Sequence, residues 1–409
     1  MIPAGAPLPA EAAWRYEGWR VVAVCFCMAV FGWGLGFYGH SVYLAELQRV
    51  HGWPATWIAT ATTGFYLLGA LLVAFISEAI RALGARNCLL AGVACMAAAT
   101  VALGQITAPW QLYAVYALMA FGWAGTSLGA ITTVLGLWFD RRRGMAISLA
   151  LNGASFGGIL GVPLLVLAIG AFGFAGAVLA AGVAMVVVLV PLIVIFIGRS
   201  PLPARLAPPG VAGGAAAVPA RVRAQALRSV AFLSVTIAFS LVLFVQVGFI
   251  VHLVSFLDPV IGRDRAAIAV AVLTAMAVVG RLTLSTMIDR LNQRLASALS
   301  FASQAVALIV LINACDAGLI YAAAALFGFS VGNLITLPAL IIQREFDAAA
   351  FGVLVSLLTA INQITYSLGP GVIGLLRDLA GGYVVPFAMC VGLQLVAAAL
   401  VMVRGRAAV

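Results

Sequence analysis

The sequence predicts an all-α membrane protein with twelve transmembrane helices arranged as two pseudo-symmetric six-helix bundles. Three observations predict this fold: the composition, the length of the apolar runs, and a repeat between the two halves. Of the 409 residues, 65% are apolar and 8% are charged, whereas soluble domains carry about 25% charged residues. So few charges cannot cover a water-soluble surface. The composition therefore excludes an ordinary soluble enzyme, a nucleic-acid-binding module and a disordered protein.

Continuous apolar runs, each near the length of about 20 residues that crosses the hydrocarbon core, are expected to form the helices. Breaks containing Gly and Pro separate them. Continuous runs also exclude a membrane β-barrel, whose strands alternate. The predicted spans are residues 20–45, 56–80, 87–106, 110–138, 145–168, 172–198, 229–256, 266–288, 295–314, 318–342, 350–374 and 383–403.

Residues 199–228 differ from the rest because they are rich in Pro, Gly and Ala and contain Arg but no acidic residue. We interpret them as a cytoplasmic linker between an N-terminal bundle, residues 1–198, and a C-terminal bundle, residues 229–409.

The distribution of Arg predicts the orientation in the membrane. All 22 basic residues are Arg, which we attribute to the codon bias of a bacterial genome. With the N-terminus inside, 17 of them fall in cytoplasmic segments and four in outer loops, and Arg281 lies within a span. We therefore expect a multi-pass protein of the cell inner membrane with both termini in the cytoplasm. The net charge of +10 then reflects topology and requires no nucleic-acid partner.

The two halves also repeat at a shift of 207 to 210 residues. Residues 83–86 map onto 291–294, and the other matched positions in the first half are Phe139, Asp140, Gly144, Asn152 and Pro163, which recur as Phe346, Asp347, Gly352, Asn362 and Pro370. A six-plus-six parallel repeat is typical of transporters with a central site at mid-membrane. Chance matching among apolar residues is the alternative.

The sequence resembles the major facilitator superfamily over essentially its whole length. The segment between spans two and three is similar to the G-x-x-x-D-R-x-G-R signature of that superfamily, with Gly84 in place and Arg86 one residue beyond the final Arg position, but with Arg81 where Asp is expected. The resemblance implies a twelve-helix fold in which charged residues near the cytoplasm clamp the helices. The candidate gating residues are Arg81, Arg86, Asp140, Arg141, Asp289 and Arg290.

Within the superfamily, the run from Trp138 to Ala146 resembles the W-F-x-x-R-R-G-x-A segment of monocarboxylate and oxalate/formate transporters. Gly18–Trp19, Gly369–Pro370–Gly371 and Asp378 continue the resemblance. It implies a secondary transporter of a small organic anion that works by alternating access, as a symporter or an antiporter. Lys is absent, so no P-loop can form, and we expect no ATP-driven transport, enzyme activity, metal or cofactor.

Arg281 is the sharpest candidate for substrate binding, because an Arg at the centre of a span costs at least about 2.5–3.5 kcal/mol. In the resembling transporters, an Arg of the eighth span binds the substrate carboxylate, with the two parallel hydrogen bonds that suit this anion. The alternative is that Arg281 reaches the inner headgroups, since Ile288 is seven residues away, about 10 Å along a helix. The Asp that the family has one turn earlier is replaced by Ala277.

His40 and His252 lie near the outer ends of spans one and seven, and they are the candidates for proton coupling because His titrates near neutral pH. Ordinary interfacial hydrogen bonding is the alternative. The other candidates for substrate binding are polar residues within spans, which could equally bond helix to helix: Tyr38, Tyr66, Asn152, Asn333, Asn362 and Tyr366.

The first hypothesis for function is therefore a transporter of a small organic anion, with a proton as a second partner and a monomer as the functional unit. The second is an exporter of neutral or lipophilic compounds in which Arg281 is structural. A membrane receptor that does not transport is the third.

Overall fold

The computed structural model describes residues 11, 16–139, 142–198, 217–287, 291–334, 336–347 and 350–404. These residues are overwhelmingly helical and include no strand. Ten helical segments of the described part are long and apolar enough to cross a membrane. One of them, Arg143–Phe196, has 54 residues and turns at Gly173, whose φ is +71°, so it makes two crossings. With the shorter apolar helix Ala317–Val331, the described part has twelve crossings, which confirms the predicted fold class.

The first half contains six crossings. The first is continuous through α1 (Gly18–Trp33), the π-helical turn η1 (Gly34–Tyr38) and α2 (Gly39–His51). The second crossing is α3 (Ala55–Ala74) with α4 (Ile76–Leu83), the third is α5 (Ala85–Ala102), and the fourth is α6 (Pro109–Thr126) with α7 (Leu128–Gly136). The fifth is α8 (Arg143–Phe156), η2 (Gly157–Gly161) and the first part of α9 (Val162–Phe196), and the sixth is the second part of α9.

The second half follows the same order. A short helix, α10 (Ala217–Ala226), precedes six crossings formed by α11 (Val230–Ile261), α12 (Arg263–Met287), α13 (Gln293–Asn313), α14 (Ala317–Val331) with α15 (Leu337–Glu345), α16 (Phe351–Ala380) and α17 (Val384–Met402). The part of the predicted linker that the structure describes is thus mainly helical. Its sequence, AVPARVRAQA, is rich in Ala and Arg, which favour a helix.

Glycines let the first crossing approach the fifth closely. A Cβ built on Gly153 of α8 would lie 2.2 Å from the carbonyl oxygen of Phe26 in α1. One built on Gly157 of η2 would lie 2.6 Å from the carbonyl oxygen of Val30. Only glycine allows such backbone contact, which is how small residues pack helices in membranes.

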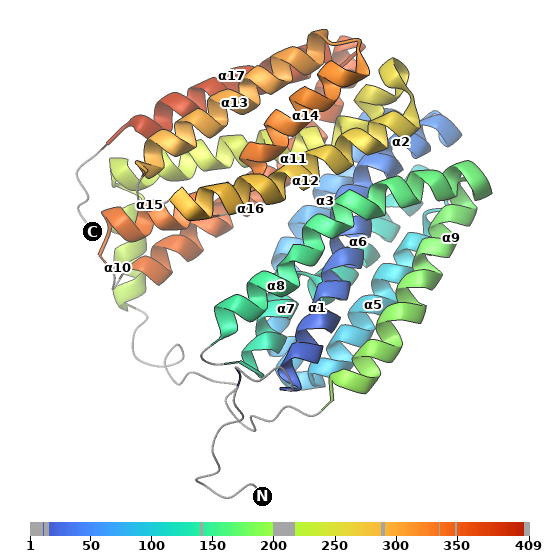
Figure 1. Ribbon diagram of the computed structural model, residues 1–409, viewed down its shortest axis with the longest axis horizontal. Helices are drawn as coiled ribbons and strands as arrows, with labels where there is room; N and C mark the ends of the chain where they lie inside the picture. The colour runs from blue at the N-terminus through green and yellow to red at the C-terminus, as the bar shows by residue number, and fades with distance from the viewer. Residues whose placement is uncertain are drawn as a thin grey trace, which may run out of the picture.

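The helices form two groups, α1–α9 and α10–α17, whose axes meet at one end of the molecule and diverge toward the other (Figure 1). Where they meet, α3 packs on α16 and α2 packs on α11. Between described residues, every side-chain hydrogen bond that joins the groups lies toward this end. The groups diverge toward the end at which α1 begins and α17 ends.

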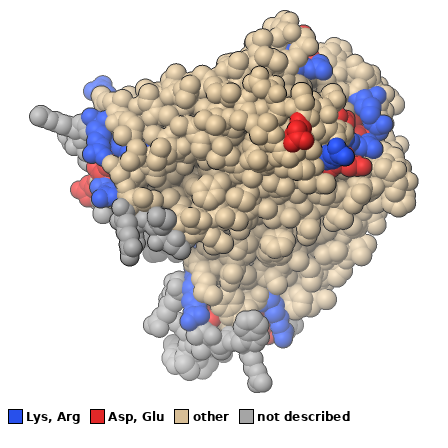
Figure 2. Space-filling view, turned by 45° about the horizontal axis from the view of Figure 1, so that its top comes forward, with Lys and Arg blue, Asp and Glu red and all other residues tan. Residues whose placement is uncertain are grey.

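The outer surface is suited to lipid. Large apolar side chains are exposed along the outer helices, among them Leu167 at 63%, Val187 at 64% and Leu379 at 76%. Figure 2 shows a broad uncharged face with the charged side chains gathered toward its ends. A soluble protein would not expose so large an apolar area, so this face matches the hydrocarbon core of a bilayer.

Candidate functional site

Arg281 lies on α12, where that helix packs closely on α14. A Cβ on Gly332 would lie 1.9 Å from the carbonyl oxygen of Ala277, so the two backbones are in contact there. The Arg281 side chain is half-buried, and its Nε donates a long hydrogen bond of 3.5 Å to the carbonyl oxygen of Gly332. Arg281 forms no ion pair with any described residue. Its terminal nitrogens are thus available to a ligand.

Tyr38, on the opposite half, lies near this guanidinium. It belongs to η1, is 8% exposed, and its hydroxyl is close enough to Arg281 to interact with the positive charge. Arg281 of α12 in the second half and Tyr38 of η1 in the first half therefore interact across the boundary between the two helix groups. The long Nε bond of Arg281 leaves its side chain loosely held.

Tyr66 and Tyr366 contact each other where the two halves meet. Their rings are in edge contact across the interface between α3 and α16, with centroids 5.9 Å apart. Phe37 joins the same cluster by packing against Tyr38 and Tyr66. The buried Tyr66 hydroxyl has no hydrogen-bond partner among the described residues. The structure therefore brings together Arg281, Tyr38, Tyr66 and Tyr366 from four different crossings.

The three candidate asparagines have surroundings different from those of Arg281 and the tyrosines. Asn362 is buried and accepts a 2.8 Å hydrogen bond from Ser240, which joins α16 to α11 within the second half. Asn333 lies just after α14, donates to its own helix at Phe329, and lines a pocket of about 270 Å³ bordered by α12 and α13. Asn152 of α8 is half-buried and makes no side-chain hydrogen bond to another described residue.

His40 is fully buried within the first half. Its ring packs edge-on against Phe65 at 4.6 Å, Tyr116 at 4.9 Å and Tyr66 at 5.7 Å. Neither ring nitrogen has a hydrogen-bond partner among the described residues. The histidine is thus enclosed by aromatic side chains and does not line an outer vestibule.

His252 is also fully buried, but in the second half, where both ring nitrogens have partners. Its Nε2 lies 3.0 Å from the Pro370 carbonyl oxygen and its Nδ1 lies 3.1 Å from the Tyr383 hydroxyl. This pattern fits a neutral ring that donates from Nε2 and accepts from Tyr383. The neighbours of His252 and those of His40 are different, so the two imidazoles do not form one site.

The candidate gating residues differ in their surroundings. Arg81 pairs with Glu78 at 3.4 Å on the exposed surface of α4, and Arg86 is exposed at the start of α5 without an ion pair among the described residues. The other four gating candidates, Asp140, Arg141, Asp289 and Arg290, lie outside the described residues.

Sequence reasoning did not predict the polar contacts that join the two halves. The Asp378 carboxylate of α16 accepts hydrogen bonds from the Thr56 amide at 2.7 Å and the Thr56 hydroxyl at 2.6 Å, at the first turn of α3. Glu46 is 1% exposed and pairs with Arg263 of the other half at 2.7 Å. Acidic residues just beyond the ends of predicted spans were the available signal, because a buried carboxylate needs a partner.

The comparisons with known proteins agree with this fold. The family model of the Major Facilitator Superfamily matches residues 22–370. The chain belongs to the Major Facilitator Superfamily. Its fold is similar to the nucleoside transporter NupG, with a TM-score of 0.79 over 94% of this chain and 99% of that chain at 13% identity for the D323A mutant. It is also similar to a bacterial homologue of the human lysosomal transporter Spinster, solved inward-facing and occupied, with a TM-score of 0.72 over 95% and 97% at 14% identity.

Two curated relatives match part of this major facilitator chain. The MFS-type transporter pynF of Aspergillus niger is 28% identical over 202 residues, which is 48% of this chain and 45% of that protein. The uncharacterized transporter ESBP6 of Saccharomyces cerevisiae is 31% identical over 156 residues, which is 35% of this chain and 22% of that protein. The matches thus span less than half the length of these relatives.

Proposed function

We propose that this protein is a secondary active transporter of a small organic anion, of the monocarboxylate type. The observation that carries the proposal is the position of Arg281, a cation between the two halves with no carboxylate partner among the described residues. A buried cation without a partner is costly, and an anionic ligand would neutralise it. The curated relatives, which are named transporters, support transport as the activity.

The guanidinium can bind a carboxylate with its two terminal nitrogens while Nε keeps its bond to Gly332. The hydroxyls of Tyr38, Tyr66 and Tyr366 surround the same region and can donate to the carboxylate or to a substituent on the anion. Because Tyr66 and Tyr366 come from opposite halves, movement of one half against the other would open and close this site.

Alternating access fits the distribution of contacts between the halves. Hydrogen bonds join them at the end that holds Thr56 and Asp378, and the helix axes diverge toward the other end. If the Arg distribution sets the topology, the diverging end is cytoplasmic and the structure corresponds to an inward-open state. The gating candidates Arg81 and Arg86 lie at that end. A bacterial inner membrane and a monomeric unit complete the proposal.

Proton coupling is a further part of the proposal, with His252 as the stronger candidate. Protonation of its Nδ1 would require the Tyr383 hydroxyl to stop donating and start accepting, because both ring nitrogens would then be donors. Tyr383 lies five residues after Asp378, so this change would occur close to the contact between the halves. His40 would need to gain water inside an aromatic enclosure before it could titrate.

Uptake by purified protein in liposomes tests the proposal. We expect accumulation of a labelled monocarboxylate, and we expect Arg281→Lys to reduce the rate at least about tenfold because Lys cannot form the paired hydrogen bonds. Arg265→Lys, at an exposed position, is the matched control and should transport normally. Thermal melting of each variant separates lost binding from lost folding. Full uptake by Arg281→Lys would remove Arg281 from the carboxylate site.

One observation favours a second candidate, the export of neutral or lipophilic compounds. The bond from Arg281 to Gly332 links α12 to α14, so the side chain could serve only to hold two helices together. In that case amphiphiles, and not carboxylates, would raise the melting temperature of the purified protein. Arg281→Lys would then lower stability without changing the preference among ligands.

A further inference from the structure

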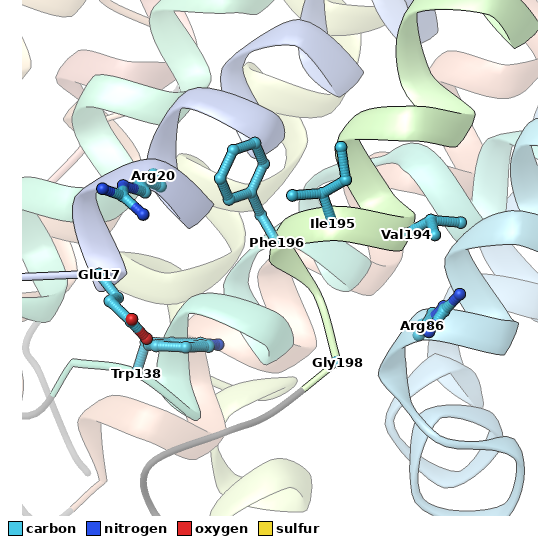
Figure 3. A pocket seen from close by; sticks show the side chains of 8 residues that line it. All are labelled: Glu17, Arg20, Arg86, Trp138, Val194, Ile195, Phe196 and Gly198. Atoms are coloured by element: carbon cyan, nitrogen blue, oxygen red, sulfur yellow. The ribbon is translucent and has the colours of Figure 1, made fainter.

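A cavity lies at the end of the first half where α1 begins. It has a volume of about 420 Å³ and is bordered by the starts of α1 and α5 and the end of α9. Figure 3 shows Arg20 and Arg86 on opposite sides of it, with Phe196 and Ile195 between them. The remaining lining residues are Glu17, Trp138, Val194 and Gly198.

The corresponding place in the second half is filled by a buried ion pair. Arg294, the repeat mate of Arg86, is the second residue of α13, as Arg86 is of α5. Arg294 is 1% exposed and donates to both oxygens of Glu345, from Nε at 2.6 Å and from a terminal nitrogen at 2.7 Å. It also donates to the carbonyl oxygens of Val401 and Val403 at the end of α17.

The shift that relates the two halves maps this arrangement onto the cavity. A shift of 207 residues, one less than that between Arg86 and Arg294, takes Glu345 to Trp138, and it takes Val401 and Val403 to Val194 and Phe196. All three of these positions line the cavity. The first half therefore has the arginine and its surroundings but a tryptophan where the second half has the carboxylate.

The result is a site with uncompensated positive charge. Neither Arg20 nor Arg86 forms an ion pair within the part of the chain that the structure describes, and Glu17 is the one acidic residue in the lining. The Arg20 guanidinium lies 6.0 Å from the centre of the Phe196 ring, which holds it beside the cavity. Two guanidinium groups facing one space favour a multivalent oxyanion such as phosphate.

We propose that this cavity binds the phosphate group of an anionic phospholipid, which replaces the carboxylate that the second half supplies from its own chain. Ile195, 69% exposed, and Val194, 38% exposed, continue from the cavity along the outer surface of α9, where acyl chains would pack. Basic pockets between helices at the cytoplasmic side of a membrane are a known type of lipid site. The site is independent of the transported solute.

Lipid binding to the purified, delipidated protein tests this inference. Native mass spectrometry and melting temperature would be measured with phosphatidylglycerol, with phosphatidylcholine and with inorganic phosphate. We expect phosphatidylglycerol to bind and stabilise best, and we expect Arg20→Ala or Arg86→Ala to weaken its binding about fivefold each. Arg142→Ala, which removes an exposed charge from the same end of the same half, should bind as the parent protein does.

The variant Trp138→Glu restores the carboxylate found at the equivalent position of the second half. We expect it to lose the stabilisation by phosphatidylglycerol, because the chain would then supply its own anion. Equal stabilisation by phosphatidylcholine would overturn the proposal, and so would unchanged binding in Arg86→Ala and Arg20→Ala. Binding of inorganic phosphate as tight as that of phosphatidylglycerol would overturn the assignment to a lipid.

Discussion

At the scale of single residues, three arginines illustrate how the surroundings determine the role of one side chain. Arg294 is enclosed and fully paired, Arg86 faces an open cavity, and Arg281 lies between the halves with one long bond. Because each guanidinium stays charged, what differs among them is the source of the compensating anion. The chain supplies it for Arg294, and ligands are proposed to supply it for the other two.

The Arg294–Glu345 pair gives the first prediction. Glu345→Gln removes the charge that balances a guanidinium exposed by only 1%, and breaking a buried pair from one side costs about 3–5 kcal/mol. Because the Glu345 side chain is 28% exposed, we expect the lower end of that range. Chemical or thermal unfolding in detergent measures the loss.

The matched control is Glu78→Gln, which breaks the pair with Arg81, where the side chains are 57% and 47% exposed. Such surface pairs contribute about 0–1 kcal/mol, so this variant should unfold close to the parent protein. Equal losses in the two variants would show that the burial of Arg294 does not determine the effect.

At the scale of helices, contact between backbones holds the first and fifth crossings together. We predict that Gly153→Ala destabilises the protein by about 1–3 kcal/mol, the usual cost of overpacking, because the new Cβ would lie 2.2 Å from the Phe26 carbonyl oxygen. The control is Gly144→Ala in the same helix, where no atom lies within 4 Å of the new Cβ. That change should be neutral or stabilising by up to about 1 kcal/mol. Melting temperatures of both variants decide the matter.

The helices themselves could be predicted because hydropathy is a local property. Each predicted span falls on helical residues, and the break predicted between residues 168 and 172 lies at Gly173, where φ is positive. What the sequence could not predict is the rotation of each helix, since a membrane span is apolar toward lipid as well as toward its neighbours. His40 is therefore in the expected crossing but faces the interior of its own half.

Part of the candidate site could also be predicted, because a charged residue inside an apolar span is a local signal. The charge of Arg281 inside a span identified the residue without any knowledge of its neighbours. The contact between Thr56 and Asp378 joins residues 322 positions apart, and the pair Arg294–Glu345 joins residues 51 apart. Such pairs depend on how helices pack, which the local pattern does not specify.

At the scale of the whole molecule, the predicted topology can be tested with a natural thiol. Cys315 is exposed in the turn between α13 and α14, whereas Cys25, Cys88 and Cys390 are buried. With the N-terminus inside, this turn faces outward, so a membrane-impermeant maleimide should label intact cells and Cys315→Ser should abolish the signal. Labelling that appears only after the membrane is broken would reverse the orientation and make the diverging end of the structure an outward-open one.

The contacts between the halves give the last prediction, on the balance between conformations. Asp378 of the second half caps the first turn of α3 in the first half, and this bond must break when that end opens. Hydrogen bonds to a charged acceptor contribute about 1 kcal/mol more than those to a neutral one, so Asp378→Asn should raise the population open at that end about fivefold. Distances between spin labels on α3 and α16 measure that population.

Asp316→Asn is the matched control for this prediction. Asp316 lies at the same end and caps α14 in the same way, through the Leu319 amide at 3.0 Å, but both partners belong to the second half. It should reduce stability by a similar amount without changing the distance distribution. If both variants shift the distances equally, general loosening of the helix ends explains the change. If only Asp378→Asn shifts them, one carboxylate couples the start of α3 to the movement of the whole second half.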